Sequence, residues 1–177
     1  GTGKGITTKA GPILDVDSLR KCEEYQPDLV VILDKAIVSQ EFLDGVKCPK
    51  IWIDHHPLLK RDNVIYFNPK MFDPNDNRCP SYWCYHLVGG SKWIAAVGIT
   101  ADWDIPPFLD ELKKEYPGLI GDNPKSPPDL LFNSKLGDLT KIFFFCLKGT
   151  STDVKKTINC LMKIQDPNEI LEQTTPP

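Results

Sequence analysis

The chain has 177 residues, of which 41% are hydrophobic and 10% aromatic, so it is long enough to bury a substantial core. Its formal net charge of −3 gives no overall attraction to nucleic acids or acidic membranes, so a polyanion would have to be bound locally or through a metal ion. No stretch approaches the roughly 20 apolar residues of a membrane-spanning helix, and the N-terminus lacks the apolar core of a secretion signal. We therefore expect one globular, cytoplasmic unit with no membrane partner.

The first half of the chain predicts a parallel sheet with a crossover helix. Residues 17–26 form an amphipathic pattern typical of a surface helix. Residues 29–33 (LVVIL) and 50–53 (KIWI) are continuously apolar, as strands covered on both faces are. Residues 39–46 lie between them and begin at a serine, which suits a short crossover helix. Residues 64–67 (VIYF) predict a third strand of the same sheet.

The second half predicts mainly helices. Residues 73–80 (DPNDNRCP) consist largely of Asp, Asn and Pro, which favour a loop, and residues 106–128 are rich in proline and predict a partly irregular connection. Ser81 is a good helix N-cap for the segment that follows the loop. The predicted helices cover residues 81–88, 91–103, 134–149, 152–164 and 166–171. The expected fold class is α/β, a parallel sheet flanked by helices with a helical C-terminal subregion.

Ionisable side chains follow the first two predicted strands. Asp34 follows one strand, and Asp54, His55 and His56 follow the next. Because the carboxyl ends of parallel strands meet at one edge of a sheet, these side chains should converge there. Carboxylate and imidazole ligands suit manganese, iron or zinc better than calcium. Asp102, at the end of an apolar helix, is a third acid, although any of these acids alone could simply cap a helix or form a turn.

The segments that carry these residues resemble motifs of the DHH family of phosphoesterases, which is named for its Asp-His-His triplet. VVILD, IWIDHHP and VGITADW are similar to the second, third and fourth motifs, and YFNPKMFDPNDNRCPSYWCY to the connecting segment. The resemblance runs from about Gly11 to Ile170 and is greatest to the archaeal RecJ-like branch. The resemblance implies a parallel sheet flanked by helices, and two bound divalent ions, Mn²⁺ or Mg²⁺. It also implies that the protein hydrolyses phosphoester bonds, often those of single-stranded nucleic acids.

The resemblance also implies roles for individual residues. Asp34 matches the acid that bridges both metal ions, His55 matches a metal ligand, and Asp102 matches the last acidic ligand. His56 matches the histidine that contacts the substrate phosphate in some members and a metal in others, and Asp54 would orient the histidines. We therefore predict His56 and Asp54 as catalytic residues.

A second candidate site lies at the start of the helix after the loop. Arg78 and the backbone at Ser81 could bind a substrate phosphate at the helix N-terminus. The alternative is a surface arginine beside an ordinary helix cap.

The first motif of the family, an apolar strand that ends in Asp-x-Asp, is missing. Asp15 and Asp17 have this spacing, but we interpret them as a turn followed by a helix cap rather than as metal ligands. We therefore expect residues 1–177 to be a single DHH-type phosphoesterase domain that is truncated at the N-terminus, so that the first motif is absent. We also expect it to lack the C-terminal substrate-binding domain of the family.

The function that we expect is that of a divalent-metal-dependent phosphoesterase, a RecJ-like single-strand nuclease in which two metal ions activate water. Its partners would be single-stranded DNA or RNA, or short oligonucleotides. Two alternatives stay open: a catalytically inactive DHH-type scaffold that binds replication or repair proteins, and a phosphodiesterase of small oligonucleotides or dinucleotides. The sequence does not distinguish DNA from RNA, the polarity of attack or the oligomeric state.

Overall fold

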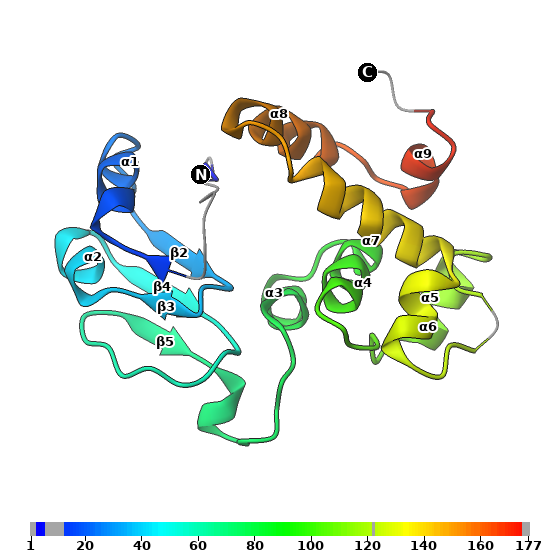
Figure 1. Cartoon of the computed structure of the whole chain (residues 1–177), viewed down its shortest axis with the longest axis horizontal. Coiled ribbons are helices and arrows are strands. Elements are labelled where there is room, and N and C mark those ends of the chain that lie inside the picture. The colour runs from blue at the N-terminus through cyan, green and yellow to red at the C-terminus, as the bar shows by residue number, and fades with distance from the viewer. Residues whose placement is uncertain (1–2, 6–12, 122, 175–177) are drawn as a thin grey trace. The chain divides into compact units, whose positions relative to one another are not determined.

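The computed structural model of the protein describes residues 3–5, 13–121 and 123–174 (Figure 1). Its contacts divide the chain into two compact units, Gly1–Pro80 and Ser81–Pro177. All the described strands belong to the first unit, and helices make up the described part of the second. The parallel sheets and their flanking helices confirm the predicted α/β class. That the whole chain forms one truncated phosphoesterase domain stays a prediction.

The main sheet has three parallel strands in the order β2-β4-β5, namely β2 (Val30–Leu33), β4 (Lys50–Ile53) and β5 (Ile65–Phe67). Leu33 pairs with Ile53, so the first two strands end side by side. The pairing continues one residue further, because Asp34 N–H donates to Ile53 O at 3.0 Å and Asp54 N–H donates to Phe67 O at 3.1 Å. The residues that follow the strands are therefore held in register at one edge of the sheet.

The predicted crossover helix is present between the first two main strands. Ser39 is its N-cap, and Ser39 Oγ accepts a hydrogen bond from Phe42 N at 3.1 Å. Two very short strands that the sequence did not clearly mark pair in parallel as a second sheet. The remaining elements of the first unit are α2 (Gln40–Gly45), β1 (Ile13–Leu14), β3 (Ile37–Val38), the 3-10 turns η1 (Val16–Ser18) and η2 (Pro69–Met71), and α1 (Leu19–Glu23).

The core of the first unit includes the fully buried Trp52 of β4. The Trp52 ring stacks on Tyr66 of β5 with their centroids 4.2 Å apart, and its Nε1 donates to Lys35 O at 3.0 Å. This indole therefore ties together β4, β5 and the segment that follows Asp34. The buried residues of this core are Leu14, Cys22, Ile32, Val38, Phe42, Leu43, Val46 and Trp52.

The second unit confirms the predicted helical C-terminal subregion. α7 packs against α4, α6 and α9, and its Leu136 and Leu139 are fully buried. No helix among the described residues has both the length and the apolar composition needed to cross a membrane. The helices are α3 (Pro80–Val88), α4 (Lys92–Ala101), α5 (Leu109–Glu115), α6 (Pro127–Phe132), α7 (Lys135–Cys146), α8 (Ser151–Leu161) and α9 (Pro167–Leu171).

Two local predictions differ from the structure. α3 begins at Pro80 rather than after Ser81, because proline suits the first helical position, where no intrahelical N–H bond is needed. Ser81 therefore lies in the first turn of α3 and is not its N-cap. The sequence predicts that β2 is covered on both faces, but its Val31 and Leu33 are about half exposed. The proline-rich segment 106–128 is partly irregular, as predicted, and it also contains the whole of α5, whose sequence LDELKKE consists largely of strong helix formers.

Candidate metal centre

Three predicted site residues converge at the ends of β2 and β4. Asp34, His55 and His56 each offer one ligand atom, and these three atoms lie within 4.8 Å of one another. Asp34 is half-exposed and has a left-handed backbone with φ 54°, a conformation that aspartate tolerates better than most residues. The two histidines are partly buried, and their rings meet edge to face at a centroid distance of 4.7 Å. The parallel register of the sheet thus produces the predicted cluster within the first unit.

The hydrogen bonds of His55 define which ring nitrogen faces the acid. His55 Nδ1 lies 2.9 Å from Asn77 O, and a carbonyl oxygen only accepts, so Nδ1 carries the proton. In the neutral ring the lone pair is therefore on Nε2, which lies 3.6 Å from Asp34 Oδ1. A lone pair that faces a carboxylate oxygen is repelled unless a proton or another cation lies between them.

A buried carboxylate orients the second histidine. Asp54 is completely buried, and its Oδ1 lies 2.8 Å from His56 Nδ1 while its Oδ2 accepts from His56 N–H at 3.1 Å. Because the Asp54 carboxylate accepts at both oxygens, His56 Nδ1 is the protonated nitrogen and Nε2 carries the lone pair. A carboxylate bonded to Nδ1 in this way fixes the tautomer and the orientation of the ring.

Residues that follow β5 hold the backbone of both histidines. Asn68 is completely buried, and its Nδ2 donates to His56 O at 3.0 Å and to Tyr66 Oη at 2.9 Å. Asn68 Oδ1 accepts from Lys70 N–H at 3.0 Å, and Lys70 Nζ donates to His55 O. Sequence reasoning missed both residues, although an Asn-Pro pair directly after a predicted strand was a visible signal.

The ligand set fits a divalent transition metal. A carboxylate and imidazole nitrogens are suited to manganese, iron or zinc, and His55 offers its unprotonated Nε2. The His56 nitrogen that lies near Asp34 is Nδ1, at 3.9 Å from Asp34 Oδ1, and this nitrogen is bonded to Asp54. His55 Nε2 and Asp34 Oδ1 lie 3.6 Å apart. A cation bound between them would remove the repulsion between the ring lone pair and the carboxylate.

Asp102, Asp15 and Asp17 are the other acids considered as ligands. Asp102 is the C-cap residue of α4 and belongs to the second unit, so its role as a metal ligand stays a prediction. Asp15 is the N-cap of η1, and its Oδ1 accepts from Asp17 N at 3.2 Å. The turn and helix cap expected for Asp15 and Asp17 are therefore present, and they require no metal. Gly11, where the resemblance begins, lies outside the described residues.

The two residues predicted to bind phosphate have clear contacts of their own. The Arg78 guanidinium forms a fork with Asp76, in which Nε lies 2.9 Å from Oδ1 and Nη2 binds Oδ2. These hydrogen bonds from Arg78 hold the pKa of the Asp76 carboxyl below its usual value. Ser81 packs against α4, since a Cβ added to Gly98 would lie 2.2 Å from Ser81 Oγ. Their binding of substrate stays a prediction.

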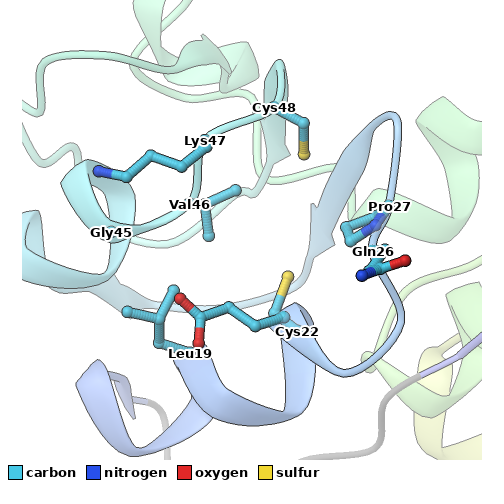
Figure 2. A pocket seen from close by; sticks show the side chains of 9 residues that line it. Leu19, Cys22, Gln26, Pro27, Gly45, Val46, Lys47 and Cys48 are labelled. Atoms are coloured by element: carbon cyan, nitrogen blue, oxygen red, sulfur yellow. The ribbon is translucent and has the colours of Figure 1, made fainter.

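A pocket in the first unit is separate from these residues. It has a volume of about 210 Å³ and lies between α1 and the segment after α2, as Figure 2 shows. Leu19, Val46 and the thiols of Cys22 and Cys48 line it, and burial raises the pKa of the Cys22 thiol. The pocket is smaller than most ligand sites and is lined by none of the three clustered residues, so we do not treat it as the active site.

Comparison of the chain with protein-family models, curated proteins and solved structures found no match, so the resemblance to the DHH family rests on the quoted motifs alone.

Proposed function

We propose that the protein is a divalent-metal-dependent phosphoesterase, and that it acts as a RecJ-like single-strand nuclease. The observation that carries the proposal is the cluster of Asp34, His55 and His56 with the buried Asp54 behind it. It agrees with the DHH-type motifs in which these residues occur. Single-stranded DNA or RNA, or short oligonucleotides, are the proposed substrates, and Mn²⁺ or Mg²⁺ is the proposed cofactor.

The residues of the cluster have separate roles in this proposal. Asp34 and His55 hold the metal through a carboxylate oxygen and a ring Nε2. When bound, a divalent ion supplies Lewis acidity and lowers the pKa of water, as phosphoester hydrolysis requires. His56 contacts the substrate phosphate, and Asp54 stabilises the positive charge on the ring whenever His56 takes up a proton at Nε2.

The two-ion chemistry of the family needs more ligands than these three residues provide. Asp102 is the further ligand that the resemblance implies, and the acids of the family's first motif would supply others. We propose two ions for the complete enzyme.

A non-catalytic scaffold for replication or repair proteins is the second candidate function. It is favoured by the missing first motif. A scaffold does not require a buried carboxylate that fixes the tautomer of one histidine. It also does not require two histidines beside an exposed acid. We therefore place the enzyme first.

Hydrolysis of labelled single-stranded oligonucleotides tests the proposal. We expect Mn²⁺ to support release of nucleotides, chelator to abolish it, and His56→Ala to lower the rate by at least about a hundredfold with most of the bound metal retained. His86→Ala is the matched control, since His86 is the third histidine of the chain and contacts the Tyr82 carbonyl in its own helix.

The assay should use both this chain and any longer natural polypeptide that adds an upstream first motif, because two-ion catalysis depends on the full ligand set. Failure of the longer protein to cleave single-stranded DNA, RNA and dinucleotides at saturating Mn²⁺ would favour the scaffold instead.

A further inference from the structure

One peptide group, between Asn77 and Arg78, is hydrogen-bonded at both of its ends. Its C=O accepts the proton of His55 Nδ1 at 2.9 Å, and its N–H donates to Asp76 Oδ1 at 3.0 Å. A peptide group is planar, so a partner that anchors the N–H also sets the direction of the C=O. The Asp76 carboxylate is thereby linked to the His55 ring through a single rigid group.

The turn formed by residues 73–78 is stiffened by its own side chains. Asp76 Oδ1 also accepts from Arg78 Nε, and Asp76 Oδ2 lies 3.1 Å from the same nitrogen. Asp76 is only 9% exposed at its side chain, although it lies in a loop. The Asp73 side chain bonds a different group of the turn, since its Oδ1 accepts from Asn75 N at 2.9 Å, while the Asp73 backbone O accepts from Asp76 N–H at 2.9 Å. The Asp76 and Arg78 side chains therefore fix the peptide group bonded to His55. The Asp73 side chain takes no part in these bonds.

We propose that Asp76 and Arg78 are positioning residues, which hold His55 in the Nδ1–H tautomer through the Asn77–Arg78 peptide group. A carboxylate bonded to the N–H polarises the peptide, so its carbonyl becomes a stronger acceptor for the imidazole proton. Asp54 acts directly on His56, and Asp76 acts on His55 with one peptide group between them. The consequence for metal affinity rests on the proposed function, whereas the tautomer does not.

This inference assigns Arg78 a role different from binding phosphate. A guanidinium held in a fork by Asp76 is neutralised by it, which weakens its attraction for a substrate anion. If Arg78 positions His55, its removal should weaken metal binding and leave the KM for oligonucleotide unchanged once the metal is saturating. If it binds phosphate, its removal should raise KM and leave metal affinity unchanged.

The tautomer of His55 can be measured in the metal-free protein. In nitrogen-15 correlation spectra of the histidine rings, recorded where the rings are neutral, we expect wild-type His55 to carry its proton on Nδ1. In Asp76→Ala we expect a mixture with the Nε2–H form. Asp76→Asn keeps a neutral acceptor of the same shape, so it should lie between the two. Asp73→Ala is the control, and its His55 signals should match the wild type.

Titration with Mn²⁺ measures the consequence. We expect Asp76→Ala to weaken metal binding about tenfold, the scale seen when a group that orients a metal-binding histidine is removed, with Asp73→Ala within about twofold of the wild type. Thermal unfolding of each variant verifies that it is folded.

A folded Asp76→Ala or Asp76→Asn protein with wild-type tautomer and wild-type Mn²⁺ affinity would overturn the inference. If Asp76→Ala shows the tautomer change, and the wild type with an upstream first motif hydrolyses no phosphoester at saturating Mn²⁺, the inference is supported and the phosphoesterase is contradicted. If the wild type binds no Mn²⁺, the proposed metal centre fails, and the tautomer measurement alone decides whether Asp76 positions His55.

Discussion

Buried polar side chains differ between the two units of the chain in the hydrogen bonds that they make. In the first unit, Asp54 and Asn68 are completely buried, and each makes at least one hydrogen bond to His56. In the second unit, Thr100 is also completely buried, but its hydroxyl has no hydrogen-bond partner among the described residues. Thr140 bonds only a carbonyl of its own helix, Leu136 O at 2.9 Å. Polar groups are costly to bury, so the satisfied network around the histidines indicates where precise geometry is needed.

Among the substitutions that test this comparison, Asn68→Ala should have the largest effect on the free energy of unfolding. Asn68→Ala leaves His56 O, Tyr66 Oη and Lys70 N–H without the partner they have now, and unsatisfied buried groups cost about 1–3 kcal/mol each where water cannot replace the bond. We expect the free energy of unfolding to fall by about 2–4 kcal/mol in urea denaturation. The exposed Asn159→Ala in α8 should change it by less than about 0.5 kcal/mol. A loss of similar size in both variants would remove the contrast.

Left-handed backbone positions provide a second comparison. Asp34 in the first unit has φ 54°, and Trp103 in the second has φ 61°. Trp103 ends α4 in a Schellman motif, in which Trp103 N–H donates to Thr100 O and Asp104 N–H donates to Ile99 O. Glycine usually occupies this position, because a side chain there costs roughly 1–2 kcal/mol.

Trp103→Gly removes this strain and should therefore raise the free energy of unfolding by about 1 kcal/mol. The larger conformational entropy of glycine in the unfolded chain offsets part of this gain. Trp103 is 59% exposed, so little packing is lost. Thermal unfolding would measure the gain, and Trp103→Ala, which keeps the strain, should show none. A clear loss of stability in Trp103→Gly would mean that the indole packs more tightly than its exposure indicates.

Thr100→Val should have the smallest effect. The substitution removes a buried hydroxyl that lacks a partner and preserves the shape of the side chain, so we expect a gain of a few tenths to about 1 kcal/mol. Thr140→Val loses a bond to its own helix and should be neutral or slightly destabilising. Chemical denaturation of the two variants side by side measures the difference. Destabilisation of Thr100→Val by more than about 1 kcal/mol would show that its hydroxyl is satisfied in the folded protein.

Sequence reasoning could predict the cluster because it follows from the parallel pairing of two short apolar strands. Once residues 30–33 and 50–53 are parallel neighbours, Asp34 and His55 must meet at one edge of the sheet. The contact of the His55 ring depends instead on the backbone of a loop. His55 bonds Asn77 O in a turn where Asp76 accepts the next N–H, and no periodic pattern encodes that geometry.

The error at Ser81 has a similar origin. Serine is a good cap, but Pro80 fits the first helical position, so the helix begins two residues before the position that a Ser81 cap would set. Local propensity identified the helix and misplaced its start, where two rules compete.

Calorimetric titration with Mn²⁺ shows whether Asp34 and His55 bind a divalent ion beside His56. We expect saturable binding by the wild type and by His86→Ala, and a loss of at least about tenfold in affinity for both Asp34→Asn and His55→Ala. Equal heats from the wild type, Asp34→Asn and His55→Ala would contradict the proposed metal centre.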